Sequence, residues 1–254
     1  MAVSNERLVS GAAAFRGDAS REFDRAVQAL LALVWAKRAP TTDFRFADDE
    51  ELDSEANAVL RGLSDTLAAR AKARAESIIR DSLPEYDFGE EWDEDWGAVD
   101  DEDGTTLLWR FDMEGSHLKD LLEIWIALAV AYDISKSELR VQISRYLNNP
   151  YSSPLWGRVP KGALSWGRGY SKNILEQITV IGQNAIVGAA RRAEQRGERR
   201  NGATYYIRRR GSGYDCDVCD DLAGYPIPIE EPFYLPHSRC MCYPEYHNGP
   251  IPNV

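Results

Sequence analysis

The sequence predicts a mainly α-helical protein: a helical body that carries a small irregular or β module at its C-terminal end, stapled by zinc. Two observations lead to this prediction. Apolar residues recur at spacings of three and four over most of the chain, which is typical of amphipathic helices. All four cysteines of the 254-residue chain then fall in one short, proline-rich stretch near its end.

Composition divides the chain into four regions. Residues 1–84 form an N-terminal helical region, 85–114 an acidic loop segment, 115–210 a helical core and 211–254 the C-terminal module. The apolar spacing predicts helices over residues 18–37, 52–80, 116–132, 135–148 and 171–196. Small residues in the last helix, such as Gly182, predict the close approach of another helix. Alternation over residues 203–210 predicts one strand, followed by short turns.

The overall composition is typical of a soluble globular protein, with 44% hydrophobic and 28% charged residues. The N-terminus lacks a basic leader followed by an apolar core, so we expect no secretory signal. The longest apolar run, residues 121–134, is too short to span a bilayer and predicts a buried helix. We therefore expect synthesis in the cytoplasm and no contact with a membrane. Thiols stay reduced there, so clustered cysteines more often bind metal than form disulfides.

An acidic stretch interrupts the helical pattern. Residues 85–103 contain eleven acidic side chains and no basic one. The stretch DDEDG is similar to the start of an EF-hand loop, but that register places Val99 at the first ligand position and Arg110 at the twelfth, where calcium requires Glu. We therefore expect a solvated acidic loop or short hairpin, anchored by Trp92, Trp96 and Trp109.

A basic stretch follows, although the formal net charge of -11 argues against general nucleic-acid binding. Between residues 155 and 210 there are twelve basic side chains and three acidic ones. The candidate basic patch for a nucleic acid or partner consists of Arg191, Arg192, Arg196, Arg199, Arg200, Arg208, Arg209 and Arg210. Such a patch can contact DNA through phosphates, contact an acidic protein surface, or remain a solvated helix end.

The cysteines are spaced as ligands of a metal. Cys216 and Cys219 form a Cys-x-x-Cys pair, His237 and Cys240 repeat the spacing, and Cys242 adds a fifth candidate ligand. A closed structural zinc site takes four ligands. We favour the first four residues, with Cys242 as the substitute if His237 points away. Disulfide pairing is the main alternative. A proline-rich segment with few aliphatic residues needs the folding free energy that structural zinc supplies, on the order of 10 kcal/mol.

No pattern typical of catalysis accompanies these cysteines. Zinc deaminases place His-x-Glu before Pro-Cys-x-x-Cys, whereas here the cysteine pair precedes His237. Glu230, Glu231 and His247 lie close enough in sequence to act as acid or base groups, but charged loop residues are more typically solvated. The sequence contains no phosphate loop, dinucleotide fingerprint or nucleophile elbow. We therefore expect no enzymatic activity and no small-molecule substrate.

The order of residues in the module resembles the C-terminal domain of the phage Mu F-like minor head proteins, the phage head morphogenesis family. The residues that carry the resemblance are Tyr205, Tyr206, Asp215, Cys216, Cys219, Leu222, Gly224, Pro236, His237, Arg239, Cys240 and Cys242. These residues cover roughly the last third of the chain. The helix that precedes the cysteines lacks the Arg-Thr-Glu-like box of the family.

The resemblance implies a structural virion protein of the phage head. Such a protein binds the portal and inner capsid proteins and assists head assembly and DNA packaging or delivery. Two other classes stay open at this point. One is a zinc-containing regulator that binds nucleic acid, and the other is a metal-dependent nuclease or effector.

Overall fold

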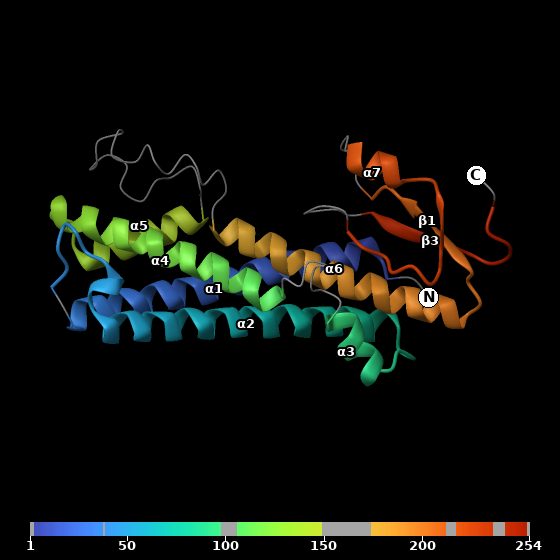
Figure 1. Cartoon of the computed structure of the whole chain (residues 1–254), viewed down its shortest axis with the longest axis horizontal. Helices are drawn as coiled ribbons and strands as arrows, with labels where there is room; N and C mark the ends of the chain where they lie inside the picture. Colours follow the sequence, from blue (N-terminus) through green and yellow to red (C-terminus); the bar gives the residue numbers. More distant parts are fainter. Residues whose placement is uncertain are drawn as a thin grey trace. The chain divides into compact units, whose positions relative to one another are not determined.

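Helices account for most of the described chain, as predicted, and the described strands form one small sheet (Figure 1). The structure is a computed structural model that describes residues 3–37, 39–97, 106–148, 174–211, 217–235 and 242–252. The chain forms two compact units: unit 1 comprises Met1–Phe15, Ala69–Leu107 and Val180–Val254, and unit 2 comprises Arg16–Ala68 and Leu108–Thr179. Long helices contribute residues to both units, so these units do not coincide with the four regions expected from composition.

Unit 2 is built from helices around an apolar core. It contains parts of α1 (Asn5–Lys37), α2 (Glu50–Ser82) and α4 (Leu107–Ala131), together with α5 (Lys136–Asn148) and the short 3-10 turn η1 (Phe46–Asp48). Ser135 caps α5, since the backbone N–H of Glu138 donates to its Oγ at 3.2 Å. Buried core side chains include Phe23, Leu30, Leu63, Leu122, Ile126, Leu139 and Ile143.

The long apolar run at residues 121–134 lies in α4 and just beyond it, and its buried side chains confirm the predicted buried helix. It also buries a carboxylate. Glu123 accepts the backbone N–H of Phe46 at 2.8 Å and Nη1 of Arg45 at 2.9 Å, so the charge that burial would penalise is satisfied. Among the described helices, none is long and apolar enough to cross a membrane.

Unit 1 contains the remaining parts of α1 and α2 with α3 (Glu90–Gly97), most of α6 (Ile174–Arg200), β1 (Tyr205–Arg209), α7 (Asp217–Leu222), β2 (Pro226–Pro228) and β3 (Tyr243–His247). The first turns of α1 pack on α6. A Cβ atom on Gly182 would overlap the ring of Phe15, and Gln183 Nε2 donates to the carbonyl of Ala12 at 3.2 Å. The predicted close helix approach is therefore confirmed at Gly182.

The first helix begins earlier than the expected residue 18. Ser4 caps it, since the backbone N–H of Arg7 donates to Ser4 Oγ at 3.3 Å. Leu8 and Phe15 are fully buried and extend the apolar stripe toward the N-terminus. Gly11 and the alanines between them carry little apolar surface, which is why periodicity alone did not reveal this part of the helix.

The acidic segment is partly helical, so the predicted loop or hairpin is wrong over residues 90–97, which form α3, and over residues 107–114, which belong to α4. Trp92 anchors it as expected: the side chain is 3% exposed, and its Nε1 donates to Glu76 Oε1 at 2.9 Å. Trp96 tilts against Trp92 with ring centres 5.7 Å apart. Trp109 instead lies on α4 and is half exposed. Val99 and the DDEDG stretch fall outside the described residues.

The sheet joins β1, at the end of the region 115–210, to β2 and β3 of the C-terminal module, with strand order β2-β1-β3 and antiparallel pairing on both sides of β1. Tyr206 stands opposite Ile227 on one side and Tyr246 on the other, and Arg208 stands opposite Pro244. Tyr206 and Arg208 are buried while their neighbours on β1 are partly exposed. The predicted strand is confirmed, but the expectation of short turns after it is wrong at α7, β2 and β3.

Candidate metal centre

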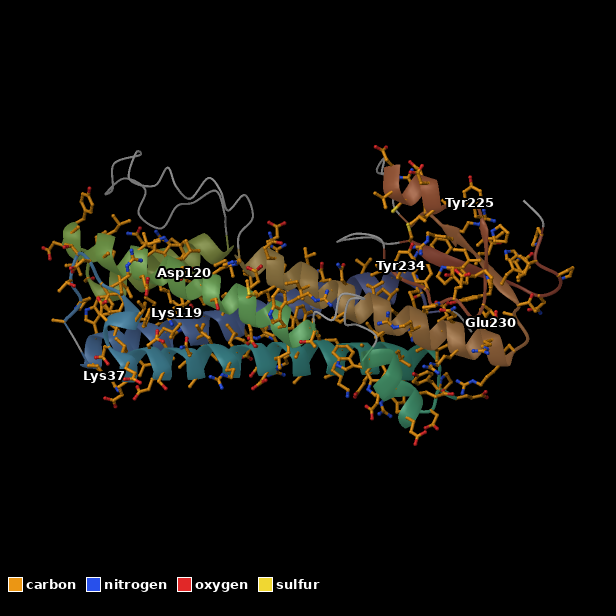
Figure 2. The ribbon with its side chains drawn as sticks, viewed as in Figure 1. Lys37, Lys119, Asp120, Tyr225, Glu230 and Tyr234 are labelled. Carbon is orange, nitrogen blue, oxygen red and sulfur yellow. The ribbon has the colours of Figure 1, made fainter. Side chains whose placement is uncertain are left out.

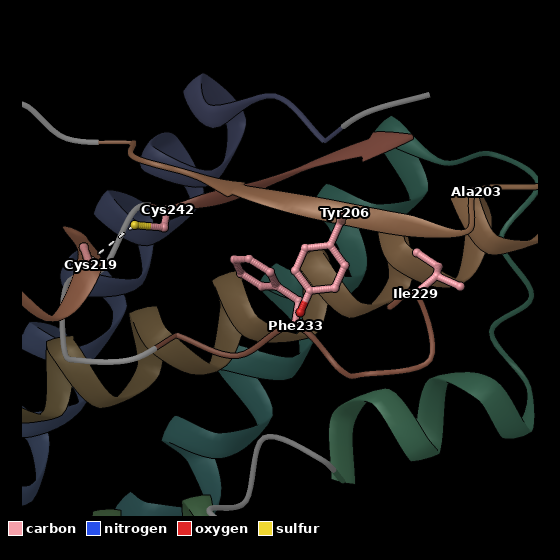
Figure 3. Packing of buried hydrophobic residues seen from close by; sticks show 6 residues of the cluster. All are labelled: Ala203, Tyr206, Cys219, Ile229, Phe233 and Cys242. Atoms are coloured by element: carbon pink, nitrogen blue, oxygen red, sulfur yellow. Dashed lines mark hydrogen bonds between the residues drawn. The ribbon is translucent and has the colours of Figure 1, made fainter. Parts of the chain in front are cut away.

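The fold brings together two cysteines that are far apart in sequence. Cys219 lies in the short helix α7, and Cys242 immediately precedes β3. Their sulfur atoms lie 3.4 Å apart, drawn as the dashed line in Figure 3. Both side chains are buried, at 4% and 3% exposure. The first and last parts of the Cys/His motif therefore converge on one point.

The sulfur atoms of Cys219 and Cys242 are in hydrogen-bond contact, with Cys242 Sγ donating to Cys219 Sγ, and a metal held by both thiolates would replace that contact. Two thiolates on tetrahedral zinc, each about 2.3 Å from the ion, lie about 3.8 Å apart. A disulfide bond would bring them to about 2.05 Å. The distance between Cys219 and Cys242 is closer to the first value. The donor chemistry also fits, because thiolates are preferred ligands of zinc.

The other three candidate ligands, Cys216, His237 and Cys240, lie outside the described residues. Cys216 directly precedes α7, and the described chain stops at Leu235, two residues before His237. In the part of the chain that the structure describes, no three His, Cys, Asp or Glu side chains gather as a metal would require. Two of the five candidates are described, and these two are adjacent.

A small apolar core supports the pair. It consists of Ala203, Tyr206, Ile229 and Phe233 together with the two cysteines, with Ile227, Leu235 and Tyr246 packed against it. Figure 3 shows the rings of Tyr206 and Phe233 side by side beneath the sheet, and their centres are 5.8 Å apart. The module therefore has more core of its own than its proline content suggests, and the cysteines are part of that core.

The tyrosines of this core are unsuited to proton transfer near neutral pH. Burial raises the pKa of Tyr206 to about 12, and burial also raises the pKa of Tyr246. Glu230 and Glu231 are exposed, as expected for solvated loop residues, and Figure 2 labels the former in the C-terminal module. His247 stacks on Tyr205 with ring centres 5.0 Å apart. These groups form no acid and base pair with the cysteines in the described structure.

A buried glutamine on α6 fastens the loop that leads to His237. Gln195 Nε2 donates to the carbonyl of Ile229 at 2.8 Å and to that of Glu231 at 2.7 Å, and its Oε1 accepts the backbone N–H of Phe233 at 2.8 Å. The side chain is 6% exposed. We name this set of three hydrogen bonds the Gln195 clip. The sequence does not predict these hydrogen bonds, because a single glutamine at the polar end of a helix does not indicate which backbone groups it will contact.

The basic patch is less exposed than its sequence suggests. Arg191 and Arg208 are buried, at 3% and 0% exposure, so neither forms part of an outer surface. Three more arginines of the patch face carboxylates: Arg200 pairs with Glu91 at 3.0 Å, Arg210 with Asp220 at 2.6 Å, and Arg209 with Glu245. Arg199 is exposed, and Arg192 and Arg196 are half-buried. The charge available to an external phosphate is correspondingly reduced.

Arg191 holds the start of the chain instead. Its Nη1 donates to the carbonyl of Val3 at 3.0 Å and to Glu194 Oε2 at 2.8 Å, and Nη2 contacts Asn5 Oδ1. Glu194 Oε1 accepts the backbone N–H of Val3 at 3.2 Å. Burial raises the pKa of Glu194, and the charge and hydrogen bonds of Arg191 oppose that rise. This arginine and glutamate connect α6 to Val3 and Asn5 inside unit 1.

No protein-family model, curated protein or solved structure matches this chain. The resemblance to phage head proteins therefore depends on the ordered motif residues alone.

Proposed function

We propose that this chain is a structural minor head protein of a tailed phage or prophage, with a C-terminal module closed by a structural zinc ion. One observation supports it most: α7 and β3 bring Cys219 within 3.4 Å of Cys242 inside a buried core. The motif that resembles the phage head morphogenesis family contains both residues. A closed structural zinc site takes four ligands and no catalytic group, and a buried pair of sulfurs held in this way can supply two of the four.

The ligand set that we propose differs from the first choice made from spacing. Cys242 was the substitute there, but its sulfur is the one beside Cys219. We therefore propose Cys219 and Cys242 as two ligands and draw the other two from Cys216, His237 and Cys240. Zinc would supply a fixed tetrahedral junction between α7 and β3 and a large part of the module's folding free energy.

The zinc site is tested by metal stoichiometry. The purified full-length chain should contain one zinc by native mass spectrometry and lose it with Cys219→Ser or Cys242→Ser. Cys216→Ser, His237→Ala and Cys240→Ser, made singly, identify the remaining two ligands. A metal-free protein in which the two described cysteines form a disulfide would replace the zinc proposal with a disulfide-closed module.

The head-protein role is tested on virus particles. We propose that the chain binds portal and capsid proteins within the phage head and is made in the host cytoplasm. Quantitative mass spectrometry of purified heads should find it at or below the copy number of the portal protein. Its absence from particles would contradict this role, and a nuclease assay with added metal and a DNA gel shift would then test the enzyme and regulator classes.

DNA contact is the weaker part of the partner proposal. Arg199 is exposed near the end of α6, whereas five other arginines of the basic patch are buried or face carboxylates. We therefore propose that this end of α6 meets an acidic protein surface or a few DNA phosphates. A gel shift repeated from low to physiological salt separates these cases, because each phosphate contact steepens the loss of affinity with salt.

A further inference from the structure

Strand β1 buries one positive charge for which the described residues supply no negative partner. Arg208 is fully buried on the inner face of β1, and its Nη1 donates to the carbonyl of Tyr234 at 2.8 Å. Its Nε and Nη2 atoms have no hydrogen-bond partner among the residues that the structure describes. Among the described residues, no carboxylate forms an ion pair with it, whereas its neighbours Arg209 and Arg210 each have one.

Such a guanidinium opposes folding unless something compensates for its charge. Loss of hydration penalises a buried cation strongly, and a single neutral hydrogen bond offsets only part of that penalty. Aromatic faces supply a further part: the guanidinium carbon lies 4.5 Å from the centre of the Phe233 ring and 4.9 Å from that of Tyr234. The two remaining donors still require an anionic neighbour.

Arg208 lies where the segments of the Cys/His motif meet. Its Cα pairs with that of Pro244, two residues after Cys242. Its carbonyl accepts the backbone N–H of Gly224 at 3.1 Å, just beyond the helix that carries Cys219. Phe233, on which it stacks, belongs to the same buried core as both cysteines. Side chains alternate across a strand, so Arg208 shares its face of the sheet with Tyr206 and the core.

The zinc site is the source of negative charge that this position lacks. Zinc held by three thiolates and one histidine has a net charge of about −1, and with four thiolates about −2. We propose that Arg208 is the counter-charge of the zinc-thiolate cluster, a positioning residue that raises zinc affinity from outside the ligand set. The inference depends on the zinc site proposed above. Arg208 then acts on the zinc site. Its place in the basic patch of the sequence had suggested contact with DNA or a partner instead.

Zinc affinity of matched variants tests the proposal. The full-length chain is titrated against a chromogenic zinc chelator at fixed pH, as wild type, Arg208→Gln and Arg208→Lys. Both variants lose the planar guanidinium group but keep a hydrogen-bond donor for the Tyr234 carbonyl. The lysine variant keeps the positive charge, and the glutamine variant does not. Removing an outer partner of a metal site typically weakens binding about 10- to 100-fold. We expect that loss for glutamine, and an affinity within about fivefold of wild type for lysine.

Two controls separate charge from packing. Arg209→Gln removes the same charge one residue away, where the side chain is half exposed and paired with Glu245, and should leave zinc affinity unchanged. Urea unfolding of the zinc-free proteins should find Arg208→Gln at least as stable as wild type, since it removes an uncompensated cation. A role in packing alone would instead weaken zinc-free and zinc-loaded protein equally.

Three results of these measurements would contradict the role proposed for Arg208. Equal zinc affinity of the glutamine and lysine variants would overturn the counter-charge proposal while leaving the zinc site intact. A glutamine variant that is as destabilised without zinc as with it, or that fails to fold in either state, would also overturn it in favour of packing. A wild-type chain that binds no zinc would overturn the site itself, and the inference with it.

Discussion

The Gln195 clip offers a direct measure of what fastens the C-terminal module to α6. Gln195→Met keeps the length and volume of the side chain but removes all three hydrogen bonds. A hydrogen bond contributes about 1 kcal/mol net, and a buried group left unpaired costs about 1–3 kcal/mol. Buried N–H groups without a partner are rarer than under-satisfied carbonyls, so the backbone N–H of Phe233 is the group most penalised. We expect a loss of about 3 kcal/mol in the free energy of unfolding.

The matched control is Gln183→Met on the same helix. Gln183 makes one described hydrogen bond, from Nε2 to the Ala12 carbonyl at 3.2 Å, so its loss should cost about 1 kcal/mol. Urea unfolding compares the two variants. Amide hydrogen exchange adds a local readout, because the Phe233 amide should lose protection only in the Gln195 variant. Equal destabilisation by the two variants, with the Phe233 amide still protected, would refute the reasoning.

Three further predictions test other parts of unit 1. Gly182→Ala should cost about 1–3 kcal/mol by thermal unfolding, since its methyl group overlaps the Phe15 ring, whereas Gly197→Ala, with open space around it, should be neutral or stabilising. Chelating zinc should expose the module to proteases near Cys219 while helical circular dichroism is largely kept; unchanged cleavage would count against a structural metal. Burial raises the pKa of Glu194 above 4.5, so the folded state binds its proton more tightly than the unfolded state does. The free energy of unfolding should therefore fall as pH rises from about 4.5 through the raised value, and Glu194→Gln should abolish this fall in urea titrations at several pH values.

Sequence periodicity predicted the helices where apolar side chains form a continuous stripe. The helix expected over residues 52–80 is α2, Glu50–Ser82, and the one expected over residues 171–196 is α6, Ile174–Arg200. The sequence prediction was wrong where the local composition favours a loop but packing holds the chain as a helix. Residues 90–97 are dense in acidic groups, which suggested a loop, but Trp92 and its hydrogen bond to Glu76 hold them as a helix.

The sequence identified the cysteines as candidate ligands, but it did not predict the contact between Cys219 and Cys242. Spacing identified the cysteines as a group, because Cys-x-x-Cys places two sulfurs on one turn. It could not show that Cys242 approaches Cys219, since that contact depends on the antiparallel register of β1 and β3. Charge counting likewise treated eight arginines as one patch. Burial separates Arg191 and Arg208 from the rest, and burial depends on which face of a helix or strand a residue occupies.

The module is thus fastened at two separate places, and they should fail independently. The Gln195 clip holds residues 229–233 to the end of α6, while the cysteine pair joins α7 to the start of β3. Loss of the proposed zinc ion would remove only the second restraint. Tyr206 and Phe233 then remain packed, and the Phe233 amide should stay protected while amides near Cys219 exchange. Breaking the clip should produce the reverse pattern, with the cysteines still able to hold metal.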